Sequence, residues 1–238
     1  PYRWLQQQLG CEDFKFPGTR RLLELAEFPD IIHCYNLHGG YFDLRALRSL
    51  SHQLPVILDL RDSWLLSGHC AYFFDCERWK TGCGNCPDLG IYPPINRDAT
   101  AYNWRRKRKV YNQSRFYVAT PSQWLMQKVE QSMLAPAIVG SRIITTGIDR
   151  AIFHAVNKLQ VRAALKLPAT AKVLLFSAFG IKQNRFKDYQ TMRDAVTLVA
   201  KRLRGEELIF IALGEDAPDE IINEARIHFV SFEKSAEA

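Results

Sequence analysis

Short apolar runs alternate along this chain with stretches whose apolar residues recur at helical spacing. Such runs predict buried strands, and the helical spacing predicts amphipathic helices between them. The expected strands cover residues 30–35, 55–60, 116–120, 142–144, 172–178, 208–213 and 227–230. The expected helices cover residues 44–54, 101–112, 161–165, 189–203 and 221–225, and another begins after Ser122, a suitable N-cap.

This alternation is typical of parallel sheets that are covered by helices on both faces. It is interrupted around residues 153–159, after the turn Gly147-Ile148-Asp149. We therefore expect an α/β protein with two domains, over residues 1–155 and 156–238. The second domain is expected to be partial, because its three strands do not complete a doubly wound sheet.

Polar residues follow the first two expected strands at their carboxyl ends. Ligands of open α/β sheets bind at that edge, so we expect these side chains to converge on one cleft. Any one histidine in such a cluster is more often structural, and the hypothesis therefore rests on the group. The group consists of His33, Asn36, His38, Arg61 and Asp62, with Gly39 and Gly40 allowing backbone N–H groups to approach a ligand.

An irregular segment, residues 61–96, separates the second strand from the next helix and is too long for an ordinary connection. It holds Cys70, Cys76, Cys83 and Cys86, spaced C-x5-C-x6-C-x2-C. Four thiolates satisfy a tetrahedral zinc ion and leave no open position, so a zinc ion here would be structural. His69 is an alternative to Cys70 as a ligand. Disulfides and free thiols remain open, although no signal peptide is visible to favour a disulfide framework.

The formal net charge of +7 favours an anionic partner: a phosphate, a nucleotide, a nucleic acid or a membrane surface. The densest basic run, residues 105–109, predicts either a solvated helix face or a contact with phosphate or anionic lipid. No apolar run approaches the roughly 18 residues that a membrane span needs. A zinc-containing nucleic-acid-binding protein without catalytic activity is the alternative function, although no helix carries a regular arginine pattern.

Several motifs occur in the order found in one branch of the family 4 glycosyltransferases, which build bacterial surface polysaccharides and exopolysaccharides. The chain resembles that branch from about residue 30 to residue 214, and the cysteine-rich insert is the most discriminating part. The matching runs are Ile31-Ile32-His33-x-x-Asn36-Leu37-His38-Gly39, Trp64-x-x-x-Gly68-His69-Cys70, Cys76-x-x-Trp79-Lys80-Thr81-Gly82-Cys83-Gly84-Asn85-Cys86-Pro87, Thr120-Pro121-Ser122-x-Trp124-Leu125, Gly147-Ile148-Asp149-x-x-x-Phe153 and Arg162-x-x-Leu165-x-Leu167-Pro168.

The resemblance implies a GT-B fold, with an acceptor-side and a nucleotide-sugar-binding domain, both Rossmann-like. It implies a hexosyltransferase that retains anomeric configuration, needs no metal for catalysis, and is cytoplasmic or peripheral at the inner membrane face. The expected acceptor is a glycan or a lipid-linked sugar. Both domains are expected to be incomplete, since the family's Gly-rich turn would precede Pro1 and its Glu-x7-Glu segment would follow Ala238. An isolated fragment could therefore be inactive.

The resemblance also assigns roles to residues. Asp62, His38 and Arg61 match the catalytic segment, and His33, Asn36, Gly39 and Gly40 lie on the acceptor side. Lys182, Arg185 and Lys187, with Gly214, match the donor side, where fixed cations stabilise a departing diphosphate. The alternative for these cations is a solvated charged loop. Two departures stand out: Arg61 replaces a histidine and cannot transfer a proton, and Asp188 replaces the glycine of a Lys-Gly pair.

Overall fold

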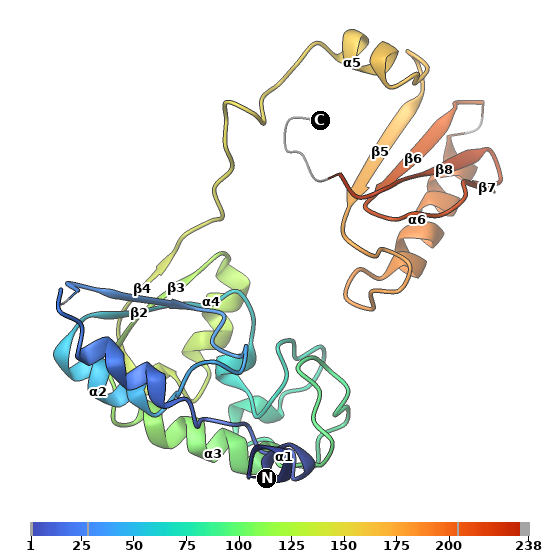
Figure 1. Cartoon of the computed structure of the whole chain (residues 1–238). Helices are drawn as coiled ribbons and strands as arrows, with labels where there is room; N and C mark the ends of the chain where they lie inside the picture. The colour runs from blue at the N-terminus through green and yellow to red at the C-terminus, as the bar shows by residue number, and fades with distance from the viewer. Residues whose placement is uncertain (1, 28, 204, 234–238) are drawn as a thin grey trace. The chain divides into compact units, whose positions relative to one another are not determined.

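A computed structural model describes residues 2–27, 29–203 and 205–233 of the 238-residue chain. The chain divides into two compact units, Pro1–Gly147 and Ile148–Ala238. Each unit has a sheet of its own, built mainly from parallel strands (Figure 1). The protein is therefore of the α/β class, as the alternation of strands and helices predicts.

The sheet of the first unit has four parallel strands in the order β1-β2-β3-β4. Its strands are β1 (Ile32–Tyr35), β2 (Val56–Asp59), β3 (Phe116–Thr120) and β4 (Ile138–Ile143). The helices of this unit are α1 (Tyr2–Gln8), α2 (Ala46–Gln53), α3 (Thr100–Tyr111) and α4 (Gln123–Glu130), with the 3-10 turns η1 (Pro17–Leu23), η2 (Trp64–Leu66), η3 (Arg78–Lys80) and η4 (Ala135–Ala137). These elements confirm most of the expected ones, with ends shifted by a few residues.

The core of this unit follows from its sequence pattern. Leu44, Leu47 and Leu50 recur at helical spacing and are fully buried in the core, and α2, which carries the last two, packs against β2 and α3. The Ser122 side chain accepts a hydrogen bond from the backbone N–H of Leu125 at 3.3 Å, which confirms it as the N-cap of α4.

The basic run on α3 does not form a single solvated face. Lys107 has no exposed surface, and the Arg106 guanidinium lies over the Phe14 ring at 4.0 Å. Arg108 lies 5.3 Å from the Trp104 ring. The interpretation as a solvated helix face is thus wrong for Lys107, because this side chain is an internal contact of the fold.

The second unit has the sheet order β5-β6-β8-β7, in which β7 alone is antiparallel. Its elements are α5 (Lys158–Ala164), β5 (Lys172–Ser177), α6 (Tyr189–Arg202), β6 (Leu208–Leu213), β7 (Glu220–Ile222) and β8 (Ala225–Val230). The helix expected over residues 221–225 is wrong. Ile222 pairs with Ala225, and Asn223 between them has φ 54°, so this segment is a tight hairpin of the kind that favours Asn at its first loop position.

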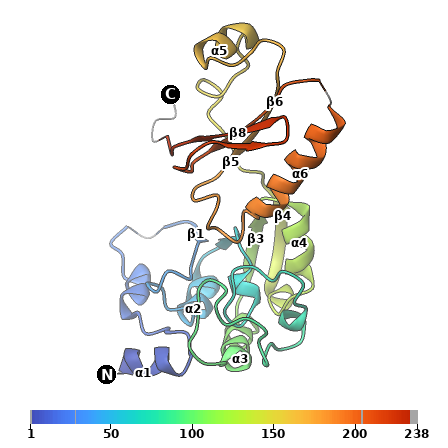
Figure 2. The same cartoon turned by 90° about the vertical axis from the view of Figure 1, so that its right-hand side faces the viewer.

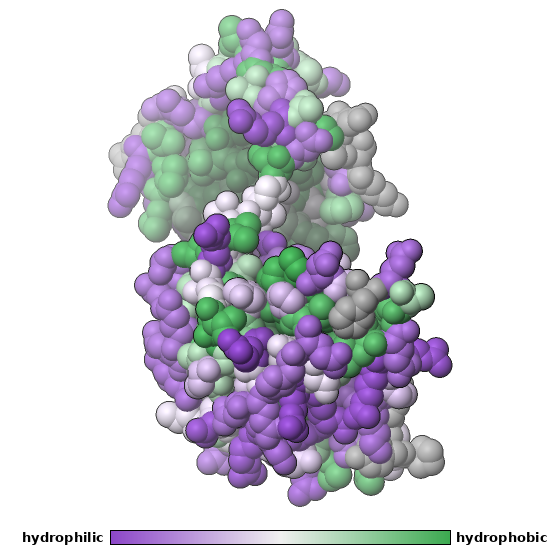
Figure 3. Space-filling model, turned by 90° about the vertical axis from the view of Figure 1, so that its left-hand side faces the viewer, coloured by the Kyte–Doolittle hydropathy of each residue, from purple (hydrophilic) through white to green (hydrophobic). Residues whose placement is uncertain are grey.

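One face of the second sheet is packed and the other is more open. Val196 and Ala200 of α6 are buried against Phe210 and Ile227, and Figure 2 shows the helix beside its sheet. By contrast, Leu175 of β5 is 65% exposed. Figure 3 shows apolar side chains gathered on the visible face of this unit.

Candidate functional site

The carboxyl ends of β1 and β2 bring together most of the polar residues that sequence analysis singled out. Tyr35 pairs with Asp59 in the sheet, so the segments that follow the two strands begin side by side. A small hollow at this edge is lined by Asn36, Leu37, His38, Asp59, Leu60, Arg61, Asp62, Trp64 and Leu65. Four of the five expected side chains thus line one hollow, whereas His33 lies outside it.

His38 and Asp62 form the central pair. The Nε2 atom of His38 lies 3.0 Å from Oδ2 of Asp62, and the two side chains are 8% and 30% exposed. The other carboxylate oxygen, Oδ1, accepts a hydrogen bond from the backbone N–H of Trp64 at 2.9 Å. Asp62 is therefore held from two sides, and it fixes the orientation of the imidazole.

Aromatic rings enclose His38. The ring of Trp64 lies 5.8 Å and that of Tyr92 5.4 Å from the imidazole, both edge-on. The Nδ1 atom is buried and has no hydrogen-bond partner within the described ranges. If Nε2–H donates to the carboxylate, Nδ1 carries a lone pair and can accept a proton or a hydrogen bond.

Arg61 belongs to a second cluster around Asp59. Its guanidinium donates to Oδ2 of Asp59 at 2.9 Å and to Oγ1 of Thr146 at 2.7 Å. His33 approaches the same carboxylate oxygen at 3.5 Å. Arg61 is thus neutralised by Asp59 and links the ends of two segments, while His38 and Asp62 remain a separate pair.

Asn36, Gly39 and Gly40 occupy the turn after β1. Asn36 and Gly40 have positive φ values of 52° and 69°, which explains a small side chain at each position. A Cβ added at Gly40 would meet no atom within 4 Å, whereas one at Gly39 would press on the Tyr41 ring at 3.0 Å. Gly40 therefore leaves its backbone open to a ligand, and Gly39 serves local packing.

A larger cavity of about 380 Å³ adjoins His38 and Trp64. Its wall combines aromatic rings, among them Phe14 and Phe42, with polar side chains such as Gln7 and Asn96. The volume lies within the roughly 300–1,000 Å³ of small-molecule sites. Aromatic faces with amide and carboxylate groups suit a polar ligand that also has apolar faces.

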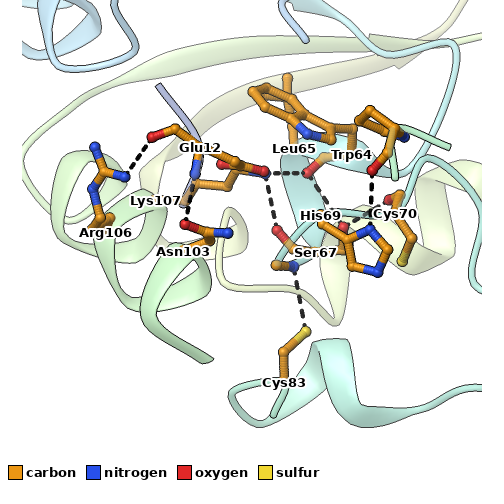
Figure 4. A network of polar contacts seen from close by, with 12 residues as sticks. Glu12, Trp64, Leu65, Ser67, His69, Cys70, Cys83, Asn103, Arg106 and Lys107 are labelled. Atoms are coloured by element: carbon orange, nitrogen blue, oxygen red, sulfur yellow. Dashed lines mark hydrogen bonds and ion pairs between the residues drawn. The ribbon is translucent and has the colours of Figure 1, made fainter. Parts of the chain in front are cut away.

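A buried ammonium anchors the loop that carries Asp62 and Trp64. The Lys107 Nζ donates to Glu12 Oε1 at 2.8 Å and to the carbonyl oxygens of Trp64 at 2.8 Å and Ser67 at 3.1 Å. It also lies 3.6 Å from the Trp64 ring centroid. Figure 4 shows this network, in which Lys107 of α3 joins the N-terminal segment to the loop.

The environment of this ion pair shifts both of its pKa values. Burial lowers the pKa of Lys107, and the neighbouring Glu12 carboxylate opposes the shift. Burial raises the pKa of Glu12, opposed in turn by Lys107. Sequence analysis missed Glu12 altogether, because its partner lies 95 positions away and nothing local marks it.

The cysteine-rich segment surrounds a much smaller cavity of about 20 Å³, lined by Cys70, Cys76, Cys83, Cys86 and His69. None of the chain's six cysteines, all within the described residues, is in a disulfide. Burial raises the pKa of Cys83 to about 12. In the part of the chain that the structure describes, no three His, Cys, Asp or Glu side chains are already arranged to hold a metal ion.

The donor-side residues lie in the second unit, after β5 and β6. Lys182 pairs with Glu220 at 2.7 Å and lies 4.5 Å from the Phe229 ring. Arg185 and Lys187 are exposed in the same loop. Gly214 has φ 106°, and a Cβ there would lie 2.2 Å from the carbonyl oxygen of Ala178. The structure thus explains Gly214 by the close approach of two strand ends.

Comparison with known proteins finds a partial similarity. Over 133 aligned residues the chain is 32% identical to the "Putative colanic acid biosynthesis glycosyl transferase WcaC" of Escherichia coli K12. The match covers 52% of this chain and about a third (32%) of that relative. No family model matches the chain. None of the helices in the described ranges is long and apolar enough to cross a membrane. The chain is therefore similar, over half its length, to a protein named as a glycosyltransferase of polysaccharide biosynthesis.

Proposed function

We propose that this chain belongs to a glycosyltransferase that moves a sugar from a nucleotide sugar to a hydroxyl of a glycan or lipid-linked acceptor. The observation that carries the proposal is the partly buried His38–Asp62 pair at the carboxyl ends of parallel strands, beside a cavity of about 380 Å³. The similarity to the E. coli protein supports the reaction class and a role in polysaccharide biosynthesis.

The proposed chemistry assigns His38 as the proton acceptor. In the transfer, the bond between the anomeric carbon and the diphosphate oxygen breaks, and the diphosphate leaves with the electron pair. The acceptor oxygen bonds to the anomeric carbon, and its proton passes to Nδ1 of His38. Asp62, hydrogen bonded to Nε2, holds the tautomer and stabilises the imidazolium, as in other dyads of this kind. Because Nδ1 is covered in the structure, the cavity wall must move to admit the hydroxyl.

The second unit would stabilise the leaving diphosphate. Fixed cations serve this purpose when no metal ion does. Within the described residues, the Lys187 ammonium makes no hydrogen bond or ion pair, whereas Lys182 is already paired with Glu220. We therefore propose Lys187 as the main phosphate contact, with Arg185 beside it in the loop and Lys182 held by its carboxylate partner.

The finer features of the proposal rest on the motif resemblance. They are a GT-B architecture with two Rossmann-like domains, membership of glycosyltransferase family 4, hexosyl transfer with retention, and catalysis without a metal. A cytoplasmic location with peripheral membrane contact also rests on this resemblance. The acceptor would bind at the first unit and the nucleotide sugar at the second.

Transfer assays test the proposal directly. The full-length protein is incubated with a panel of nucleotide sugars and glycan or lipid-linked acceptors, and products are identified by mass spectrometry. We expect one sugar added per acceptor with equal release of nucleoside diphosphate, and NMR of the new linkage should show the donor's anomeric configuration. Asp62→Asn should greatly slow transfer and the exposed Asp30→Asn should not. Equal product from both variants would contradict the assignment.

A further inference from the structure

The cysteine-rich segment next to the proposed site is not used by the transfer chemistry. Its small cavity is lined by four cysteines and one histidine, all within residues 69–86. We propose that this cavity is a structural zinc site, in which the thiolates of Cys76, Cys83 and Cys86 and the Nε2 atom of His69 bind one Zn²⁺ ion.

His69 is oriented as a metal ligand. The residue is 1% exposed, and its Nδ1 lies 3.2 Å from the carbonyl oxygen of Pro93, which fixes Nδ1 as the donor. The other ring nitrogen, Nε2, then has a free lone pair and lies 3.4 Å from Sγ of Cys86. Two ligands of one tetrahedral zinc, with Zn–N near 2.0 Å and Zn–S near 2.3 Å, are about 3.5 Å apart. Orientation of a ligating histidine by a backbone carbonyl is the usual outer-shell arrangement.

The Cys83–Cys86 turn has the form of a chelating loop. Residues 82–85 all have positive φ, including the non-glycine residues Cys83 (56°) and Asn85 (46°). Such a run is costly and persists only where surrounding contacts determine it. The backbone N–H of Gly68 donates to Sγ of Cys83 at 3.3 Å, a contact that favours a thiolate. This turn presents both sulfurs to the cavity.

The remaining wall holds Cys76 and Cys70. Cys76 lies at the end of a turn in which its N–H donates to Phe73, and the Phe73 ring stacks on the buried Trp79 at 4.4 Å. These rings fix the stretch between Cys76 and Cys83. Cys70 packs against the core of the first unit, as Cys83 also does, so packing does not separate the two. We assign the fourth position to His69 because of its orientation, and Cys70 no bond to the metal.

The cavity has the size for a single ion. Its volume of about 20 Å³ exceeds the roughly 10–15 Å³ that one water-sized occupant needs. The side chains are not yet arranged around one point. Closing the site requires the cysteine sulfurs to turn toward one point, and each cysteine has a single χ1 torsion with three staggered positions for this.

A metal here would stabilise the wall of the proposed active site. His69 also lines the larger cavity beside His38, and Gly68 follows directly on the loop that Lys107 anchors. The zinc would thus tie residues 68–86 to the loop that carries Asp62 and Trp64. It would have no open position for a substrate, so its role would be in folding.

Metal analysis of the full-length protein, purified without chelator, tests the site. We expect about one zinc per chain and a thiolate-to-metal absorption band after exchange with Co²⁺. Cys76→Ser, Cys83→Ser, Cys86→Ser and His69→Ala should each lower the zinc content. Cys11→Ser, outside the segment, and Cys70→Ser, inside it, should keep the metal.

The contrary outcomes are equally distinct. Less than about 0.2 zinc per chain in the unmodified protein, with its thiols either freely titratable or in disulfides, would overturn the site. Loss of zinc in Cys70→Ser but not in His69→Ala would overturn the assignment of the fourth ligand. Should a cysteine variant fail to fold, the zinc content and Co²⁺ spectrum of the unmodified protein still decide the question. None of these outcomes is read from sugar transfer, which is measured separately.

Discussion

The strand-end loops of the two units differ in how their polar groups are held. In the first unit, His38 and Asp62 are bound to each other and enclosed by Trp64. In the second, Arg185 and Lys187 are exposed, and Lys182 is paired with the Glu220 carboxylate at 2.7 Å. The His38–Asp62 pair is therefore oriented before any ligand arrives, whereas the exposed Lys187 presents a positive charge for an anion to organise. This difference suits an acceptor-activating group on one unit and a diphosphate contact on the other.

Removing the preorganised imidazole should have the largest effect. We expect His38→Gln to lower turnover by about 100-fold to 10,000-fold, the usual contribution of a general base. The matched control is His52→Gln, since the exposed His52 hydrogen bonds with the carbonyl oxygen of Gln113 on the surface. Steady-state kinetics with the native donor measure both. Turnover within twofold of the parent in His38→Gln would remove the residue from the chemistry.

The next largest effect should come from removing the Lys107 ammonium, which anchors the loop that carries Asp62 and Trp64. This effect should be on stability. Lys107→Met leaves the Glu12 carboxylate buried without its partner, and we expect a loss of about 3–5 kcal/mol in the free energy of unfolding. Urea denaturation measures it. Adding Glu12→Gln should recover much of the loss, because no charge then remains buried. A double variant as unstable as the single one would contradict the ion-pair explanation.

These two sites also show how far sequence reasoning reaches. The His38–Asp62 pair could be predicted because parallel strands place their carboxyl ends together, whatever the details of the loops. The Glu12–Lys107 pair could not, because Lys107 stands in a basic run that is typical of a solvated helix. Its burial depends on a tertiary contact with a distant segment.

The same limit applies to the second unit. Residues 221–225 are apolar and polar in a pattern too short to distinguish a helix from a strand. The turn at Asn223 makes this segment a hairpin. In a sequence, a single Asn that adopts the left-handed conformation is a weaker signal of a hairpin than an Asn-Gly pair. The longer elements, such as α6 and β6, carry enough periodicity to be predicted.

Removing an organising cation from the second unit should have a smaller effect than removing His38. We expect Lys187→Ala to lower turnover about tenfold, which corresponds to roughly 1.4 kcal/mol of transition-state stabilisation. Lys201→Ala, at the end of α6 and away from the loop, serves as the control. If Lys187→Ala had the same turnover as the parent with the native donor, Lys187 would not contact the phosphate, and the loop would be a solvated charged loop.

The smallest expected effect concerns Asp188, which replaces a glycine of the related motif. It has φ 47°, and its side chain accepts a hydrogen bond from Thr191 N–H at 3.3 Å as the N-cap of α6. Asp188→Gly should change the free energy of unfolding by only a few tenths of a kcal/mol, whereas Asp188→Ala should cost about 1 kcal/mol or more. Equal thermal stability of the two variants would contradict the capping role.

A double-mutant cycle on turnover tests most directly whether His38 and Asp62 act as one unit in sugar transfer. The four proteins are the parent, His38→Ala, Asp62→Asn and the double variant, all assayed with the same donor and acceptor. Because residues that act as a unit are non-additive, we expect the double variant to be no slower than the worse single variant, within about threefold. Two losses that multiply in the double variant, or a single variant with the parent's turnover, would contradict the account.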